Sequence, residues 1–189
     1  MGIAERKERA RAERQHRIAT TAREIAEREG WSAVTIRRLA DTIEYSQPVL
    51  YGHFANRDAI VAAVAVAGFG ELAAALRDAA RGTTDRQAAI EAAATAYLAF
   101  ARERPALYEA MFILPTGLHF ADAETRPELK DAFAALSTVV APSTGDPEVA
   151  TETVWAVLHG LAALERSRRI RDDAHRERLA LVVAWACAC

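Results

Sequence analysis

Cysteine is almost absent from this chain. The only two cysteines among its 189 residues, Cys187 and Cys189, stand one residue apart. Two cysteines this close cannot form an ordinary disulfide loop, and a metal site would need more ligands than the sequence places near them. We therefore expect free thiols in a reducing compartment, with no disulfide framework and no metal site.

Proline and glycine are also scarce, at six and nine residues, whereas alanine runs recur along the chain. This composition favours helices over sheets, and we find neither a strand hairpin pattern nor an internal repeat. The 51% hydrophobic content is enough to fill a sizeable core. We predict an all-α fold of about nine helices.

Long apolar segments are also missing. We expect no run of about 18 apolar residues, the length that spans a bilayer, and the N-terminus is too charged for a secretory signal. The sequence predicts a cytoplasmic protein with no membrane partner. An amphipathic membrane-surface protein is a weaker alternative, because residues 5–17 lack an apolar face.

Net charge is small overall but unevenly distributed. Residues 1–40 carry ten Lys or Arg against six Asp or Glu, a local +4 within a total of −2, so the remainder carries −6. A basic end on an acidic body fits a protein that touches phosphate at one end only. Residues 3–17 mix both signs, which predicts a solvated helix or a disordered arm, with a DNA-contacting arm as the sharper alternative.

The pattern of residues 35–57 predicts two short helices, a tight turn between them, and the start of a third helix. Thr35 is placed to cap the first helix, Ser46 is expected to cap the second through its hydroxyl, and Pro48 falls in the first turn of the second. This is the geometry of a helix-turn-helix, whose second helix enters the DNA major groove. The first helix has apolar residues at helical spacing: Ile36, Leu39, Ala40 and Ile43.

The rest of the chain predicts further helices with clear stops. Gly68–Ala73 formally matches a dinucleotide-binding glycine pattern, but no strand precedes it, so we interpret it as a flexible or closely packed point of a helix. The expected features are a helix ending at Gly30, a long helix capped by Asn56 and ending near Arg81, a stop and cap at 82–85, a break at Pro105, a loop at 114–126, a helix at 127–140, a turn at 142–147, and helices at about 147–170 and 172–188.

Nearly 40 residues of the N-terminal third carry a family pattern: Ala22, Gly30, Thr35, Ile36, Leu39, Ala40, Ser46, Leu50–Phe54 and Asn56–Ile60. Through them the chain resembles the tetracycline-repressor-like (TetR) family of bacterial transcription regulators. Residues 104–112 and 155–161 resemble a subgroup whose ligand domain carries a Trp, His and Gly motif (WHG type). The chain departs from the family at Glu44 or Tyr45, where a glycine is usual, and at Pro48, where many relatives have a small residue. We therefore expect a turn that is either strained or differently shaped, and an operator sequence that cannot be transferred from relatives.

The resemblance implies a DNA-binding domain at residues 1–58, with three helices, and a ligand-binding and dimerisation domain at 59–189. Gln47 is the candidate for an amide–base contact. For each arginine a solvated surface charge remains the alternative. For Tyr51 and Phe54 the alternative is core packing, which we prefer for Phe54. The implied DNA-contacting residues are Thr35, Arg37, Arg38, Ser46, Gln47, Pro48, Tyr51, His53 and Arg57.

The resemblance also implies a small, largely apolar effector bound between the middle helices. Core packing is the alternative for every candidate pocket residue, and structural hydrogen bonding is the first interpretation for His159. The last two helices carry larger apolar faces than one domain needs, which predicts a homodimer through them. The candidate pocket residues are Tyr97, Phe100, Tyr108, Met111, Phe112, Phe120, Trp155 and His159.

The sequence therefore predicts a dimeric, ligand-responsive DNA-binding regulator, and specifically a repressor that an effector releases from a palindromic operator on double-stranded DNA. We expect no cofactor and no enzymatic activity, since a Gly-x-Ser-x-Gly elbow and a His-Glu-x-x-His zinc pair are both missing. The alternative is a helical small-molecule carrier or sensor of the same shape without specific DNA binding.

Overall fold

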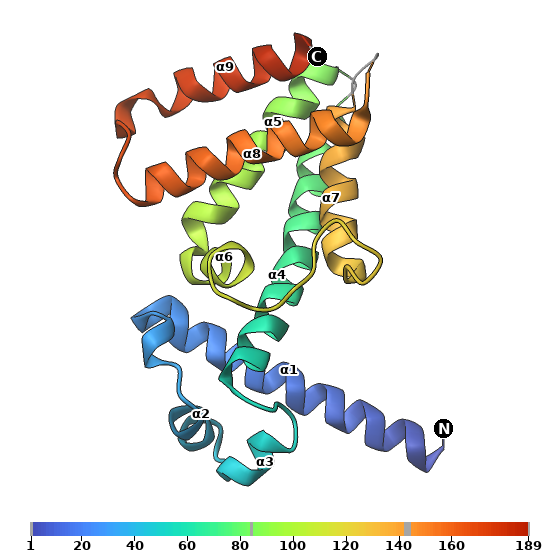
Figure 1. Cartoon of the computed structure of the whole chain (residues 1–189), viewed down its shortest axis with the longest axis vertical. Coiled ribbons are helices and arrows are strands. Elements are labelled where there is room, and N and C mark those ends of the chain that lie inside the picture. The colour runs from blue at the N-terminus through green and yellow to red at the C-terminus, as the bar shows by residue number, and fades with distance from the viewer. Residues whose placement is uncertain (1, 84, 142–144, 189) are drawn as a thin grey trace. The chain divides into compact units, whose positions relative to one another are not determined.

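The computed structural model describes residues 2–83, 85–141 and 145–188, and these residues form helices and no strand, as predicted (Figure 1). Short 3-10 turns lie at Trp31–Ala33 and Asp172–Ala174. The α-helices of the described ranges are α1 (Ile3–Glu29), α2 (Ile36–Ile43), α3 (Gln47–Tyr51), α4 (Arg57–Ala80), α5 (Arg86–Glu103), α6 (Pro105–Phe112), α7 (Pro127–Val140), α8 (Pro147–Arg166) and α9 (His175–Ala188).

Two compact units make up the chain. Unit 1 contains residues 1–68 and 104–119, and unit 2 contains residues 69–103 and 120–189. The helix α4 therefore contributes residues to both units. The domain boundary between residues 58 and 59 stays a prediction.

In unit 1, α1, α2 and α3 bury apolar side chains at the spacings that the sequence predicts. The α1 helix ends at Gly30, whose φ of 82° suits glycine. Phe54 is buried, in agreement with the core-packing interpretation. The core of this part consists of Ile18, Ala22, Ile25, Ala26, Trp31, Val34, Leu39, Ala40, Ile43, Leu50 and Phe54.

The N-terminus of α6 is fastened to the end of α1 within unit 1. Both carboxylate oxygens of Glu27 accept hydrogen bonds there, from the backbone N–H of Ala106 and of Leu107, each at 3.0 Å. The indole of Trp31 donates to the carbonyl of Ala106 at 2.8 Å. A carboxylate at a helix N-terminus satisfies free N–H groups and opposes the positive end of the helix dipole.

Gly68 lies where α4 and α6 approach closely. A Cβ at this position would stand 2.7 Å from the sulfur of Met111 and 2.8 Å from Cδ1 of Leu107, so these two side chains would have to shift to admit it. A Cβ at Gly70 would meet nothing within 4 Å. Since α4 is continuous through both glycines, the interpretation of a closely packed helical point holds at Gly68.

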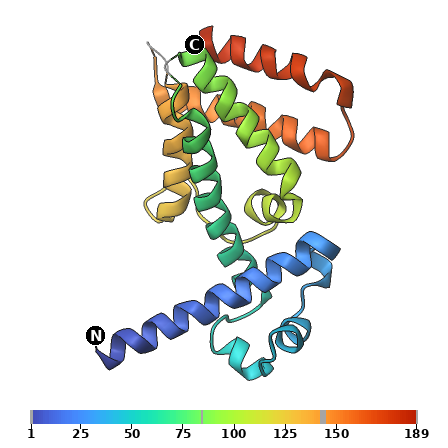
Figure 2. The same ribbon diagram turned by 180° about the vertical axis from the view of Figure 1, so that it is seen from behind.

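Unit 2 contains α5, α7, α8 and α9 together with the C-terminal part of α4. Arg86, in the first turn of α5, donates to three carbonyls: Cys187 at 3.0 Å, Val140 at 3.2 Å and Ala186 at 3.3 Å. These carbonyls belong to the last turns of α7 and α9, whose C-terminal oxygens have no partner within their own helices. One guanidinium therefore holds the ends of two helices beside the start of a third. The ribbon in Figure 2 shows the C-terminus of α9 beside the start of α5.

The connection between α8 and α9 is longer than predicted. The helices expected at about 147–170 and 172–188 end at Arg166 and begin at His175, respectively. The chain leaves the helix at Arg168, which has a φ of 53°, and the hydroxyl of Ser167 just before it donates to the carbonyl of Ala163 at 2.8 Å. Of the turn predicted at 142–147, residues 142–144 lie outside the described residues, as does Thr84 in the predicted cap at 82–85.

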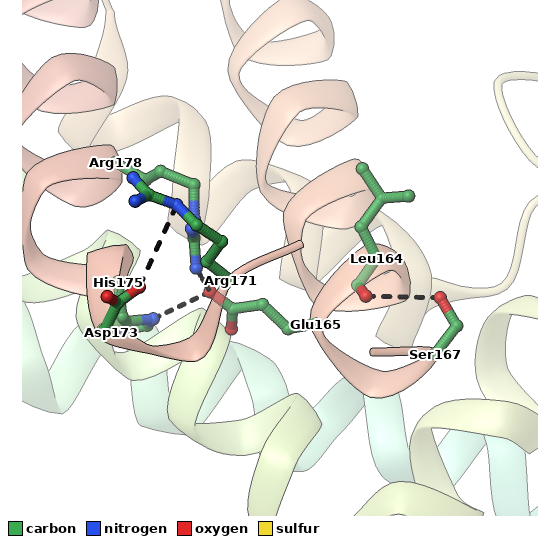
Figure 3. A network of polar contacts seen from close by, with 7 residues as sticks. All are labelled: Leu164, Glu165, Ser167, Arg171, Asp173, His175 and Arg178. Carbon is green, nitrogen blue, oxygen red and sulfur yellow. Dashed lines mark hydrogen bonds and ion pairs between the residues drawn. The ribbon is translucent and has the colours of Figure 1, made fainter. Parts of the chain in front are cut away.

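Glu165 joins α8 to α9 across this connection (Figure 3). Its Oε1 is 2.9 Å from Nδ1 of His175 and 3.0 Å from a guanidinium nitrogen of Arg178. Burial opposes the charge of Glu165, but these two hydrogen bonds outweigh it and hold the pKa of the carboxyl below its ordinary value. The carboxylate is therefore ionised at neutral pH and holds the start of α9.

The expectation that no apolar segment is long enough to cross a membrane was wrong for α4. By length and composition alone this helix qualifies as a membrane span. Half of its most apolar window is buried inside the protein, and a core helix meets the same two criteria. The apolar side chains of α4 pack into the cores of both units, which explains its apolar composition. Composition alone is therefore weak support for a membrane segment.

Candidate nucleic-acid interface

The start of α2 is capped and exposed, as predicted. Oγ1 of Thr35 accepts a hydrogen bond from the backbone N–H of Arg38 at 3.1 Å. Thr35 is itself exposed, and α2 turns its apolar residues Leu39, Ala40 and Ile43 into the core. The remaining N–H groups of this first turn, with the positive end of the helix dipole, can receive an anion.

The turn between α2 and α3 has the strained conformation that we expected. Glu44 is in the left-handed region, with φ 57° and ψ 39°, where glycine is the most easily accommodated residue. The backbone N–H of Tyr45 donates to the carbonyl of Ala40 at 2.9 Å and closes the end of α2. The guanidinium of Arg17 lies over the ring of Tyr45, 5.4 Å from its centroid. These contacts fix the angle at which α3 leaves the turn.

The second helix of the motif is short and presents its polar start to solvent. Ser46, Gln47 and Pro48 are all exposed, and Leu50 is the residue that α3 buries. Tyr51 is 54% exposed. The expected cap by the Ser46 hydroxyl was wrong, since no side-chain cap bond forms. The backbone N–H of Val49, which such a cap would bind, donates to the backbone carbonyl of Ser46 at 3.0 Å. The hydroxyl and the Gln47 amide are thus left on the open side of the helix.

The three predicted arginines differ in how they are held. Both terminal nitrogens of Arg38 donate to the carboxylate of Glu29, at 2.8 and 2.5 Å, and this pairing holds the pKa of Glu29 below its ordinary value. Arg37 lies on the exposed side of α2, 4.0 Å from Asp41. Arg38 is therefore committed to an internal partner, whereas Arg37 is open to an external one.

Arg57 has a role that the sequence did not reveal. Capped by Asn56, which accepts from the N–H of Ala59 at 2.9 Å, α4 begins with Arg57 turned back toward the segment before α2. Its guanidinium donates to the carbonyl of Val34 at 2.9 Å and to that of Trp31 at 2.6 Å. Because Val34 directly precedes Thr35, Arg57 positions the start of α2.

His53 lies partly buried between α3 and α4, against α1. Its carbonyl accepts a hydrogen bond from the side-chain amide of Gln15 at 3.3 Å, and its Nδ1 is buried with no hydrogen bond among the described residues. Burial lowers the pKa of His53, and the charges of Arg11 and Arg14 lower it further. The ring is therefore neutral at pH 7, and no sequence pattern indicated that these two arginines lie near it.

The predicted pocket residues fall in both units. In unit 2 the indole of Trp155 donates to the Tyr97 hydroxyl at 3.1 Å, and its ring is 6.4 Å from that of Phe120. In unit 1 the rings of Tyr108 and Phe112 are 4.7 Å apart on α6. The pocket itself stays a prediction, and the buried or half-buried members that complete the set are Phe100, Met111 and His159.

Burial and the charge of Arg166 lower the pKa of His159, so this imidazole is neutral at pH 7. Its neighbour Gly160 has no atom within 4 Å of a Cβ position. No other part of the described residues therefore approaches closely at Gly160. In those residues no three His, Cys, Asp or Glu side chains form a group able to hold a metal ion.

Comparisons with known proteins agree with this arrangement. The family model for bacterial regulatory proteins of the tetR family matches residues 18–64, and the model for the tetracyclin repressor-like C-terminal domain matches residues 90–184. An uncharacterized HTH-type transcriptional regulator of Mycobacterium tuberculosis, Rv0681, is 29% identical over 150 residues, which are 78% of this chain and 67% of that protein.

Solved structures share the fold at low identity. A protein with unknown function from Rhodococcus sp. RHA1 has a TM-score of 0.75 at 22% identity, over 91% of this chain and 92% of the other. The transcriptional regulator FadR from Bacillus subtilis, in complex with stearoyl-CoA, has a TM-score of 0.65 at 12% identity, over 89% and 97% of the two chains. Together with the helix-turn-helix geometry, the two family matches show that the chain is a transcriptional regulator of the TetR family.

Proposed function

We propose that the protein is a dimeric repressor that binds a palindromic operator and releases it when a small, largely apolar effector binds. The observation that carries the DNA-binding part is the exposed polar start of α3 beside the capped, open start of α2. A helix-turn-helix places these two features against the base edges and the phosphate backbone, respectively.

Within this proposal, Gln47 reads a base, while Thr35, Arg37, Tyr51 and His53 bind phosphates. Gln47 is exposed in the first turn of α3, where a side-chain amide can pair with adenine in the major groove. The neutral ring of His53 acts as a hydrogen-bond partner for phosphate rather than as a cation. Ser46 and Pro48 flank Gln47 and limit how close α3 comes to the bases.

Arg38 and Arg57 enter the proposal differently from the other contacts. Their hydrogen bonds to Glu29 and to the carbonyls of Trp31 and Val34 support a positioning role, with direct phosphate contact as the earlier prediction. In either role, positioning or phosphate contact, the two guanidinium groups act at the start of α2. Their substitution is expected to weaken binding to all sequences alike.

The dimer is proposed to form through α8 and α9. Large apolar side chains on these two helices remain exposed in the single chain, whereas their neighbours facing α5 are buried. A two-fold pair would read two half-sites about one helical turn of DNA apart. The exposed members are Val149, Leu164, Leu181 and Trp185.

For the effector, a long-chain acyl thioester is one candidate, because the FadR neighbour was solved with stearoyl-CoA and has the same fold. The aromatic side chains of Tyr97, Phe120 and Trp155, which lie together in unit 2, support an apolar or aromatic ligand. The protein is proposed to act in the cytoplasm, where its operator DNA lies.

The test of the proposed function is selection of genomic fragments by the purified protein at about 0.1 M salt, where non-specific phosphate binding is reduced. We expect recovery of a palindromic site. Gln47→Ala should then change which sequence is preferred, whereas Tyr51→Ala should weaken binding to all sequences. Binding with no preference over random duplex would overturn the proposal.

A further inference from the structure

The first helix is longer than its domain needs. The first buried residue of α1 is Ile18, although the helix begins at Ile3. At 1.5 Å per residue, the segment before Ile18 adds about 22 Å of helix. In both views the N-terminal turns of α1 extend past α3 (Figures 1 and 2). This segment buries no apolar side chain, so packing does not explain it.

The core-facing stripe of α1 continues into this segment but changes its chemistry. Ile18, Ala22 and Ile25 face the core at intervals of four and three residues. Continuing the same intervals toward the N-terminus leads to Arg14, Arg11 and Lys7, which therefore lie on the same side of the helix. We call these three residues the basic stripe. It begins where the apolar stripe ends.

Contacts with the helix-turn-helix show where the basic stripe points. Gln15, on the same side of α1, donates to the carbonyl of His53 at 3.3 Å. Arg11 and Arg14 are near enough to His53 for their charges to act on its ring. His53 is one of the proposed phosphate-binding residues, and it closes the segment that follows α3. The basic stripe thus borders the proposed DNA interface.

The basic stripe lacks the acidic partners that surface arginines usually find. Among the described residues, Lys7, Arg11 and Arg14 make no ion pair or hydrogen bond through their side chains, whereas Arg38 and Arg77 are paired with carboxylates. Of the acidic residues in this part of α1, Glu5 and Glu13 lie on the opposite side of the helix, and Glu8 lies on its flank, three residues before Arg11, with no ion pair to it among the described residues. Three cations on one side, none of them paired with a carboxylate, form a site for a line of negative charges.

We propose that Arg11 and Arg14, with Lys7, bind phosphates of the DNA backbone and extend the footprint of the helix-turn-helix beyond α2 and α3. This inference rests on the proposed DNA-binding function and adds residues that the motif does not contain. Phosphate contacts of this kind strengthen binding without reading sequence. The stripe therefore sets affinity and its salt dependence, while Gln47 sets preference.

The experiment compares two double variants that remove the same charge from the same helix. Arg11→Ala with Arg14→Ala removes the stripe, and Arg6→Ala with Arg9→Ala removes two arginines from the opposite side. Alanine is the best helix former, so both variants keep α1, which circular dichroism verifies. Affinity for the selected operator and for a random duplex is measured across a range of salt concentrations.

We expect the stripe variant to bind both duplexes more weakly, with the slope of log K against log salt reduced by about 1.8, or 0.9 for each lost phosphate contact. The ratio of operator to random affinity should remain unchanged. The opposite-side variant should retain the wild-type slope. Equal slopes in the two variants, or a stripe variant that matches the wild type, would overturn the inference.

Failure of the proposed function would look different. If the wild type bound every duplex equally, specific regulation would be refuted, yet the slopes of the two variants would still decide the role of the stripe. If the wild type bound no duplex at all at low salt, both the function and the inference would be wrong.

Discussion

The side chain of Arg57, for which the family resemblance implies contact with DNA phosphate, is held by hydrogen bonds within its own chain. Its guanidinium donates to the carbonyls of Trp31 and Val34, so it ties the start of α4 to the segment before α2. Hydrogen bonds from a charged group to partly buried carbonyls contribute more to stability than neutral bonds, and their loss leaves those carbonyls unpaired. Arg57 is thus expected to contribute to the stability of the fold even when no DNA is bound.

We predict that Arg57→Ala lowers the free energy of unfolding by about 1–3 kcal/mol. Urea unfolding measures this change. The matched control is Arg37→Ala, whose side chain is well exposed and 4.0 Å from Asp41. That control should cost less than about 0.5 kcal/mol. A stable Arg57→Ala variant with weakened DNA binding would show that phosphate contact is its main role.

The two histidines with altered titration give a pH dependence. The pKa of His159 is lowered by burial and Arg166, and that of His53 by burial, Arg11 and Arg14. In each case the folded protein binds its proton less readily than the unfolded chain does. Their contribution to stability is therefore complete above the unfolded pKa of about 6.5 and is lost as pH falls through the folded value.

We predict that the free energy of unfolding falls between about pH 7 and pH 5, and that His159→Gln makes this fall shallower. Urea unfolding at a series of pH values measures the slope. Adding His53→Gln should flatten it further, since both histidines act in the same direction. A His159→Gln variant with the wild-type slope would contradict the assignment.

At the scale of elements, local signals predicted the ends of helices well. Gly30, Thr35 and Asn56 act over three or four residues, and each stands where the sequence placed it. The hydroxyl of Ser46 failed as a cap because the backbone alone satisfies the short α3. Local patterns predict helices because the partners involved are close in sequence.

Distant contacts could not be predicted in the same way. Arg86 bonds a carbonyl 101 residues away, and Glu27 caps a helix 79 residues later. Neither residue belongs to a motif, since any surface arginine or glutamate looks alike in a sequence. The nearness of Arg11 and Arg14 to His53 was hidden for the same reason. The proposed interface was therefore only partly visible before the fold was known.

The cap of α6 by Glu27 leads to a prediction for that helix. Glu27→Gln keeps the shape of the side chain but loses the negative charge and one of the two accepting oxygens. We expect a loss of about 1–2 kcal/mol in the free energy of unfolding and faster amide hydrogen exchange in the first turn of α6. Glu24→Gln, at an exposed position of α1, is the control. Equal exchange rates in the two variants would show that the cap contributes little.

For the whole molecule, the exposed apolar side chains of α8 and α9 are the surface through which we propose that the dimer forms. Leu181 is 71% exposed and Trp185 is 41% exposed. In a two-fold interface each such residue is buried twice, so one substitution acts at two places. A charge introduced there would be buried without a partner in the dimer but solvated in the monomer.

We predict that Leu181→Arg converts the dimer into a folded monomer that binds operator DNA more weakly. Light scattering after size-exclusion chromatography gives the mass, and circular dichroism checks the fold. Ala134→Arg, on the exposed side of α7, adds the same charge and should remain dimeric. A wild-type protein that is monomeric at micromolar concentration would refute the proposed dimer.

The left-handed Glu44 has a consequence for how such a chain can change over time. A non-glycine residue there costs about 1–2 kcal/mol, while glycine would cost about 0.5–1 kcal/mol through the freedom of the unfolded chain. Glycine is therefore favoured at this position by only about 0.5–1 kcal/mol. Glutamate and glycine codons differ by one middle base, so a single transition interconverts this turn and the form usual in the family. Besides this small difference in stability, such a change would remove the exposed carboxylate of Glu44 beside the proposed DNA interface.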